Sequence, residues 1–247
     1  MQAGTSPWSL PLCYLKLLNA TENLQFTEEE SSAVVIEAAT AEENSKNWLV
    51  GSVITVTPVD EDFVVRIFRS VWKVKNVSAI SELRPNFFLI KHVSAEAKDM
   101  ILKRRPWVVH NELFSIEPFN PAWRANEYFF TTMVVWIWVH KLPLQAMNSE
   151  MVLRLGVSVG KALGVDHWIE GGNMGDFLRV LVQVDITKPL RRCVMLGNGQ
   201  GKPPSPCPLR FEKLPRLCFF CGLVGHELSS CVTKPADPDE RKLQYGS

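Results

Sequence analysis

The chain has 247 residues, of which 46% are hydrophobic and eight are Trp. This composition predicts a folded core and excludes an intrinsically disordered protein. The formal net charge of +1 excludes a positive field over the whole molecule. The charge is uneven, however: residues 1–47 hold two Lys against seven Glu, whereas residues 179–247 hold eleven Lys and Arg against six acids. The basic part of the chain is therefore its C-terminal part.

Cysteine usage and hydrophobic runs indicate the cellular compartment. Three of the six Cys belong to one metal-ligand pattern, described below, whereas Cys13, Cys193 and Cys207 show no partner spacing. No run approaches the about 18 apolar residues of a membrane span. No signal peptide is evident either. We therefore expect a reducing compartment, nuclear or cytoplasmic, and no membrane partner.

Residues 1–46 are acidic and irregular, and we expect them to be poorly packed. Within them, residues 27–41 are compatible with a short helix, because Thr27 and Glu30 match a capping box. This segment is not part of the predicted globular core.

Residues 47–120 alternate between strand and helix patterns. A β-branched run predicts a strand over residues 49–56, and Asp60 opens a helix whose apolar residues recur every four positions up to Trp72. Ser94 caps a second helix that ends at Lys103. The other strands are predicted over residues 74–83, 87–93 and 106–117. This βαββαβ order is the split-βαβ arrangement and predicts a domain like an RNA-recognition motif.

Residues 121–215 are predicted to form a second α+β block that packs on the first. Its pattern predicts a helix over residues 149–160 and strands over residues 133–139, 165–170, 177–186 and 209–214. Trp136 and Trp138 share one face of the first of these strands, and we interpret them as packing between the two blocks. The predicted fold class is thus α+β: an RNA-recognition-motif-like domain, a second small α+β block and a C-terminal metal module.

Exposed rings on the central strands of an RNA-recognition motif stack on bases. Here the predicted strand over residues 87–93 offers Phe87 and Phe88 on opposite faces, and the strand over residues 49–56 has no aromatic residue. We therefore interpret both rings as core or partner-face residues, with a base-stacking platform as the alternative.

Residues 216–233 contain the pattern C-x2-C-x4-H-x4-C, whose ligands are Cys218, Cys221, His226 and Cys231. Three thiolates and one imidazole complete a tetrahedral zinc shell with no open position, so the predicted site is structural and not catalytic. Gly222 follows the second ligand, where the backbone turns sharply. So short a segment cannot bury a core, and zinc binding would supply its folding free energy. The pattern predicts a CCHC zinc knuckle with Zn2+ as its cofactor.

Zinc knuckles commonly grip single-stranded nucleic acid. Phe219 and Phe220 lie between the first two ligands, where an exposed ring would stack on a base, and Lys213 and Arg216 would meet phosphates from the flank. The knuckle loop itself has no Lys or Arg, so a protein partner is the alternative. Residues 234–247 are expected to form a disordered tail.

The sequence shows no arrangement typical of an enzyme. No carboxylate pair, nucleophile triad or phosphate loop occurs at diagnostic spacing. His92, His110, His140 and His167 have no metal or nucleophile partner at usable spacing. We therefore expect a protein that is not an enzyme and has no small-molecule substrate.

Several short motifs over about residues 47–246 are similar, in order, to those of one known family. They include Leu-Val-Gly at residues 49–51, Asn-Phe-Phe-Leu at 86–89, Val-Trp-Ile-Trp-Val at 135–139, Phe-Leu-Arg-Val at 177–180 and Phe-Glu-Lys-Leu-Pro at 211–215. The chain resembles the plant domain-of-unknown-function family that carries a C-terminal CCHC knuckle and occurs in LINE-type retrotransposon proteins and their derivatives. Family members usually have Gly where this chain has Arg105, and a basic residue where it has Leu223.

The resemblance implies an RNA-recognition-like globular part and a zinc knuckle that together coat the RNA of the element. Our prediction is a non-enzymatic, zinc-dependent, retrotransposon-derived protein that binds single-stranded nucleic acid, RNA more than DNA. Two alternatives stay open. One is a protein-interaction or multimerisation module that self-associates and whose knuckle docks a protein partner, and the other is a decayed copy of a retroelement gene.

Overall fold

The computed structural model describes residues 27–29, 31–32, 38–72, 79–91, 94–166, 177–197, 201, 203–235 and 243–245. The chain divides into two compact units, Met1–Asn44 and Ser45–Ser247. Near the end of the first unit, residues 28–29 lie in a turn and the helix α2 (Ala38–Ser45) begins. The helix expected over residues 27–41 thus begins only at Ala38 among the described residues. Residues 1–26 and the capping-box residue Glu30 lie outside them.

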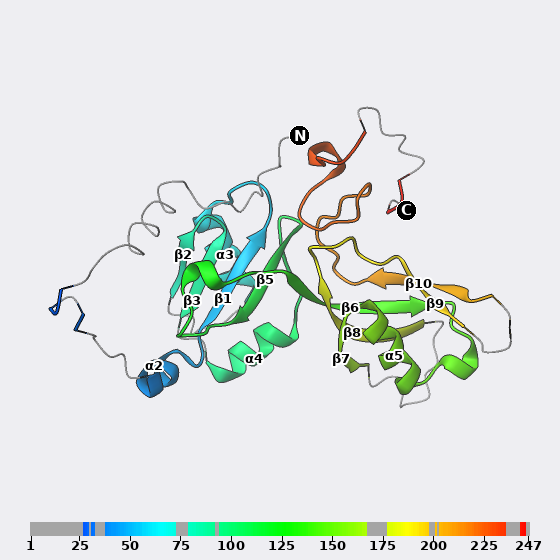
Figure 1. Cartoon of the computed structure of the whole chain (residues 1–247), viewed down its shortest axis with the longest axis horizontal. Helices are drawn as coiled ribbons and strands as arrows, with labels where there is room; N and C mark the ends of the chain where they lie inside the picture. The colour runs from blue at the N-terminus through cyan, green and yellow to red at the C-terminus, as the bar shows by residue number, and fades with distance from the viewer. Residues whose placement is uncertain are drawn as a thin grey trace. The chain divides into compact units, whose positions relative to one another are not determined.

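The first sheet of the second unit has five antiparallel strands in the order β2-β3-β1-β5-β4 (Figure 1). The helices α3 and α4 follow β1 and β3 along the chain. Ser94 Oγ accepts a hydrogen bond of 3.2 Å from the Ala97 N–H, which confirms Ser94 as the N-cap of α4. The elements are β1 (Leu49–Ile54), α3 (Glu61–Trp72), β2 (Ala79–Arg84), β3 (Phe87–Lys91), α4 (Ala95–Lys103), β4 (Trp107–Val109) and β5 (Glu112–Pro118).

The single strand expected over residues 106–117 is a hairpin of β4 and β5. His110 and Asn111 form its turn with φ angles of 48° and 67°. Two successive residues with positive φ are typical of two-residue hairpin turns, whose twist matches that of the strands. The sequence has no Gly or Pro at this turn, so its pattern predicts one continuous strand in place of the hairpin. The order of the other elements is as predicted, and the comparison with an RNA-recognition motif stays a prediction.

The helices α3 and α4 cover one face of the first sheet. Val64, Phe68 and Trp72 recur every four residues on α3 and are buried there. The ring of Phe68 lies 4.4 Å from that of Trp72 and 4.3 Å from that of Phe114, measured between centroids. Phe88 belongs to the same core, which confirms its interpretation as a core residue.

The opposite face of the first sheet is closed by residues 119–130. Phe87 is only 1% exposed, and its ring lies 5.7 Å from those of Tyr128 and Phe130. The Tyr128 hydroxyl donates a hydrogen bond of 2.9 Å to the carbonyl of Asn120, which connects the two ends of this segment. Phe87 is therefore a core residue too and is not available to stack on a base.

The second sheet is also antiparallel, with the strand order β7-β8-β6-β10-β9. Asn148 caps its helix α5 by accepting a hydrogen bond of 2.9 Å from the Met151 N–H. The strand expected over residues 165–170 begins earlier, at Lys161, and residues 167–170 lie outside the described part. The strand β9 was not expected. The elements are β6 (Thr132–His140), α5 (Ser149–Val159), β7 (Lys161–Val165), β8 (Phe177–Asp185), β9 (Cys193–Leu196) and β10 (Ser205–Phe211).

Alternate residues of β6 and β8 form the core beneath α5. This core includes Val135, Ile137, Val139, Val152, Leu155, Leu178, Val180 and Val182. Because side chains alternate along a strand, Trp136 and Trp138 lie on the face away from α5. There Trp136 contacts Arg179, and Trp138 stacks on Phe177. The prediction that these two Trp pack between the blocks is therefore wrong: their described contacts lie within the second sheet.

A shared core residue and a hydrogen bond connect the two sheets. Leu113 of β5 lies in the hydrophobic core of the second sheet. Ser115 Oγ donates a hydrogen bond of 3.1 Å to the carbonyl of Thr132, the first residue of β6. Among the helices that the structure describes, none combines the length and apolar character needed to span a membrane.

Candidate metal centre

The segment after β10 folds back on itself around four metal-ligating side chains. The Cys218 N–H donates to the carbonyl of Leu223 at 2.9 Å, and the Gly222 N–H donates to the carbonyl of Cys218 at 2.8 Å. Gly222 and Gly225 have φ angles of 74° and 95°, which glycine adopts without strain. The two glycines therefore allow the tight turns that bring the ligands together, and the turn at Gly222 is as the sequence predicts.

The ligand atoms of Cys218, Cys221, His226 and Cys231 all lie within 4.8 Å of one another. Cys221 Sγ and His226 Nε2 are 3.4 Å apart. A tetrahedral shell with Zn–S of about 2.3 Å and Zn–N of about 2.0 Å has ligand atoms roughly 3.5–3.8 Å apart. The donor set and its spacing fit a zinc ion. With four protein ligands the shell would be closed, which is typical of a structural site.

The thiols of this cluster differ in acidity. Burial raises the pKa of the Cys221 thiol, and the neighbouring Cys218 thiol raises it further. Burial acts in the same direction on Cys231, but hydrogen bonds with Thr233 and His226 outweigh it and lower the pKa of that thiol. Zinc takes cysteine ligands as thiolates, so its binding must release protons from the cluster.

Comparison with known protein families agrees with this geometry. A family described as "Zinc knuckle" matches residues 184–233. The chain carries a zinc knuckle. The match begins before the metal-binding segment predicted over residues 216–233 and includes the strands β9 and β10, so the family pattern combines the knuckle with part of the second sheet.

One curated protein is similar to a larger part of the chain. The uncharacterized protein At4g02000 of Arabidopsis thaliana is 25% identical over 145 residues. The similarity spans 57% of this chain and 44% of the Arabidopsis protein, so the chain corresponds to less than half the length of that relative.

The knuckle packs against the rest of the second unit through its backbone and one buried side chain. Val224 belongs to the core of the second sheet. The Leu190 N–H donates to the carbonyl of Gly222 at 2.9 Å. A Cβ atom on Gly225 would lie 3.1 Å from the carbonyl oxygen of Ile54, so the knuckle backbone closely approaches the end of β1. These contacts fix the position of the knuckle relative to both sheets.

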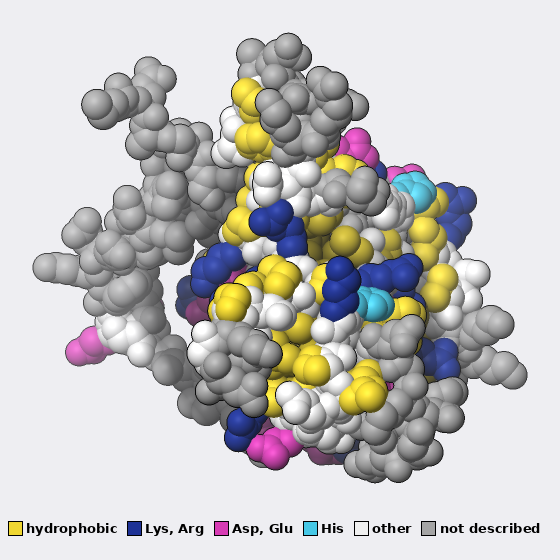
Figure 2. All heavy atoms as spheres, turned by 90° about the vertical axis from the view of Figure 1, so that its right-hand side faces the viewer, with side chains coloured by type: hydrophobic (Ala, Val, Ile, Leu, Met, Phe, Trp, Pro, Cys, Tyr) yellow, Lys and Arg dark blue, Asp and Glu magenta, His cyan; other side chains and the backbone are white. Residues whose placement is uncertain are grey.

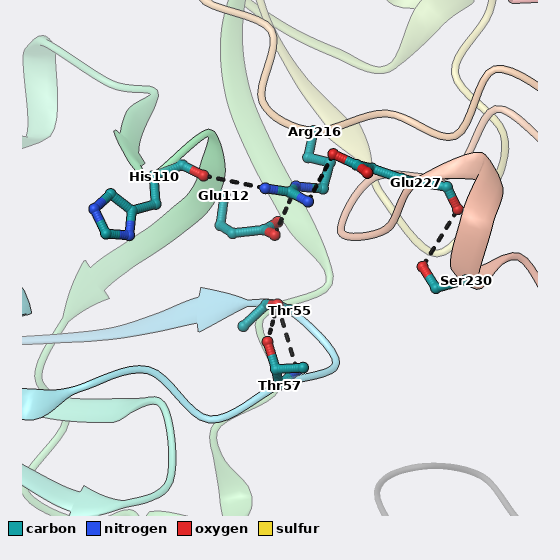
Figure 3. Close-up of polar contacts among 7 residues, drawn as sticks. All are labelled: Thr55, Thr57, His110, Glu112, Arg216, Glu227 and Ser230. Atoms are coloured by element: carbon teal, nitrogen blue, oxygen red, sulfur yellow. Dashed lines mark hydrogen bonds and ion pairs between the residues drawn. The ribbon is translucent and has the colours of Figure 1, made fainter.

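Arg216 links the knuckle to the β4–β5 turn (Figure 3). Its Nε lies 2.8 Å from Glu112 Oε1, and its Nη1 lies 2.7 Å from Glu227 Oε1. Its backbone N–H donates to the carbonyl of Asn111 at 2.5 Å. Glu112 is only 8% exposed; burial raises the pKa of its carboxyl, and the positive charge of Arg216 partly offsets this effect. The guanidinium predicted to meet phosphate is therefore held by two carboxylates within the protein.

The other predicted contact residues are placed differently. Phe219 is 48% exposed, whereas Phe220 is partly buried. Lys213 is exposed and lies two residues after the end of β10, with a φ angle of 46°. Of the four residues predicted to contact nucleic acid, Phe219 and Lys213 are thus exposed.

Part of the predicted disordered tail packs on the knuckle. The Tyr245 N–H donates to the carbonyl of Phe219 at 3.1 Å, and a Cβ atom on Gly222 would lie 2.2 Å from the Tyr245 ring. Arg192 Nη1 donates to the carbonyl of Gln244 at 3.0 Å, and its guanidinium lies 5.4 Å from the Tyr245 ring centroid. Residues 243–245 are therefore ordered against the knuckle, while residues 236–242 and 246–247 lie outside the described part.

Sequence reasoning missed the partners that hold the knuckle in place. Glu112 and Tyr245 are distant from the metal ligands along the chain, and neither lies in a motif that points to them. The one indication in the sequence was the basic flank around Arg216, and Arg216 was interpreted as a residue that contacts phosphate. Only the acids that the fold brings beside Arg216 change that interpretation.

Proposed function

We propose that this protein is a non-enzymatic, zinc-dependent binder of single-stranded nucleic acid, with a preference for RNA over DNA. The observation that carries the proposal is an exposed ring, Phe219, between two ligands of a closed Cys3His cluster. The zinc ion would hold the loop rigid, and the ring would then stack on a base at little ordering cost. Such stacking contributes about 1–3 kcal/mol per base.

Positive charge beside the knuckle supports this proposal. We assign the phosphate contact to Lys213, because it is exposed and lies at the end of β10 before the knuckle. Arg216 becomes a positioning residue, since its guanidinium lies between Glu112 and Glu227. A closed four-ligand shell leaves no coordination position for a substrate, which supports a role in binding and not in catalysis.

We further propose that the chain derives from a plant LINE-type retroelement protein. The ordered motifs over residues 47–246 support this origin, and the similarity to an Arabidopsis protein is compatible with it. In that setting the single-stranded ligand would be the RNA of the element, and we expect the protein in the nucleus or cytoplasm.

A second candidate function is a protein-interaction module that self-associates. One observation favours it: the helix α5 exposes Leu153 and Val157, the latter to 67% of its surface, on the side away from the sheet. The knuckle also has Leu223 and Glu227 where basic residues would favour RNA. Apolar helix faces of this kind often pack against a partner.

The test is binding of the purified full chain to a labelled single-stranded RNA, with and without a zinc chelator, across a salt series. Cys221→Ser removes one zinc ligand, and Cys193→Ser is the matched control because Cys193 is an exposed cysteine of β9 outside the cluster. We expect binding to fall at least tenfold on chelation and in Cys221→Ser, and to be unchanged in Cys193→Ser. Affinity should also fall steeply with salt.

Two outcomes would overturn the proposal. RNA binding that is indifferent to chelator would remove the knuckle from the function. Absence of RNA binding, together with concentration-dependent dimers in sedimentation, would favour the protein-interaction module. Competition by DNA of the same sequence tests the preference for RNA, because only RNA offers the 2′-hydroxyl as a contact.

A further inference from the structure

The face of the second sheet turned away from α5 carries planar and basic side chains. The strand register places them on three neighbouring strands, β8, β6 and β10, because Trp138 pairs with both Arg179 and Arg210. None of these side chains is fully buried. This set, called the aromatic platform below, consists of Trp136, Trp138, His140, Phe177, Arg179 and Arg210.

The planar groups of the aromatic platform stand in a row across the strands. The rings of Trp138 and Phe177 are parallel within 3°, with centroids 4.4 Å apart. The guanidinium of Arg210 lies 5.3 Å from the Trp138 centroid, and that of Arg179 lies 4.1 Å from the Trp136 centroid. Stacked rings and guanidinium planes on a sheet are the groups on which proteins stack unpaired bases.

An ion-pair network fixes the orientation of this row. Arg179 Nη1 lies 2.7 Å from Asp166 Oδ2, and Arg179 Nη2 lies 2.8 Å from Glu212 Oε2. Glu212 also accepts a hydrogen bond from the indole N–H of Trp138. The charge of Arg179 is therefore balanced within the protein, and its role in the row is to hold its plane over Trp136.

The positive charge available to a ligand comes from other residues. Arg210 is exposed and forms no ion pair within the part of the chain that the structure describes. Lys161 lies at the β7 edge of the same face, because the register pairs it with Gln183 of β8. Figure 2, which views the molecule from the side of the second sheet, shows Lys and Arg side chains among hydrophobic ones. A polyanion with flat, apolar bases matches this combination of charge and rings.

We propose that the aromatic platform is a second binding surface for the single-stranded RNA, continuous with the knuckle. This inference rests on the proposed function. The strand β10 connects the two surfaces: it carries Arg210, is followed by Lys213 and leads to the first zinc ligand, Cys218. An RNA strand held at the knuckle would pass Lys213 and stack its next bases against the aromatic platform.

The first test compares charge variants in the zinc-loaded full chain. Arg210→Glu reverses the exposed charge of the aromatic platform, and Arg210→Lys keeps the charge but removes the guanidinium plane. Arg69→Glu is the matched control, since Arg69 is exposed on α3 over the first sheet. We expect Arg210→Glu to weaken binding of a labelled 20-nucleotide single-stranded RNA about tenfold and to reduce the salt slope by about 1. Arg210→Lys should weaken RNA binding less than Arg210→Glu does, and Arg69→Glu should weaken it less than twofold.

The second measurement keeps the unmodified protein and needs no variant. RNA carrying 4-thiouridine is crosslinked to the zinc-loaded chain, and the modified peptides are identified by mass spectrometry. We expect crosslinks within residues 132–140 and 177–179, in addition to the knuckle. Crosslinks confined to the knuckle and the first sheet would contradict the aromatic platform.

The outcomes separate this inference from the proposed function. If Cys221→Ser weakens RNA binding but Arg210→Glu behaves like Arg69→Glu, the knuckle binds RNA and the aromatic platform does not. If the unmodified protein binds no RNA, both proposals fail together. If Arg210→Glu weakens binding and residues 132–140 crosslink, the platform is established as the second contact.

Discussion

Arg216 Nε lies 2.8 Å from Oε1 of the buried Glu112, so the first residue of the knuckle segment is paired with an acid of the first sheet. A charge buried without its partner is strongly destabilising, whereas an apolar replacement of both partners is much less so. The pair therefore couples the position of the knuckle to the integrity of the β4–β5 hairpin.

Arg216→Met should lower the free energy of unfolding by about 1–3 kcal/mol, because it leaves the Glu112 carboxylate without its cation. The double variant with Glu112→Leu should recover part of that loss. Denaturant unfolding with zinc in excess measures both. As the control, Lys103→Met breaks an exposed i,i+4 pair with Asp99 and should cost at most about 0.5 kcal/mol. An Arg216→Met cost no larger than this control would contradict the coupling.

Gly222→Ala should weaken zinc binding. The φ angle of 74° disfavours any L side chain by roughly 1–2 kcal/mol, and the new Cβ would collide with the Tyr245 ring. We expect a zinc dissociation constant at least fivefold higher in competition with a chromophoric chelator. Gly164→Ala is the control, since its Cβ would meet nothing within 4 Å. An equal effect of the two variants would show that the turn at Gly222 does not constrain the metal site.

Removal of zinc should unfold the knuckle and leave the first sheet folded. We expect the metal to supply the folding free energy of the knuckle, whereas the strand pairings of β1, β3 and β5 do not involve it. Hydrogen exchange followed by mass spectrometry should show fast exchange at the amides of Cys218 and Gly222 after chelation. Peptides spanning residues 49–54 should keep their protection. Retained protection at Cys218 without metal would show that packing alone holds the loop.

Acid should destabilise the second sheet partly through Glu212. Hydrogen bonds from Arg179 lower the pKa of this carboxyl below its ordinary value of 4.5. A lowered pKa in the folded state contributes stability above the unfolded pKa, and this contribution is lost as pH falls through the folded pKa. Between pH 7 and pH 3.5, Glu212→Gln should therefore lose less stability in urea unfolding than the unmodified protein. Glu150→Gln, in an exposed pair with Arg154, should follow the unmodified protein.

The zinc ligands and the N-cap of α4 could be predicted because each depends on residues close together in the sequence. The spacing from Cys218 to Cys231 is dictated by one ion, and Ser94 accepts a hydrogen bond from a backbone N–H three residues away. The alternation of inward and outward side chains along β6 could also be predicted. It placed Trp136 and Trp138 on one face but gave no information on what that face contacts.

The remaining features depend on residues that only the fold brings together. The turn at His110 and Asn111 uses positive φ without the glycine that usually marks it, so one strand was predicted in place of a hairpin. Arg216 was interpreted as a phosphate contact because Glu112 lies far away in the sequence. In both cases the local pattern was compatible with two structures, and long-range pairing selected one.

Val224 has a consequence for how such modules evolve and are engineered. This side chain of the knuckle belongs to the core of the second sheet, and Gly225 lies against the end of β1. The knuckle is therefore not an independent module that can be exchanged freely. A knuckle transplanted from another protein would have to bring a matching apolar residue and a glycine at these positions. Exchange between relatives should therefore succeed only when these two residues fit the sheets that receive the knuckle.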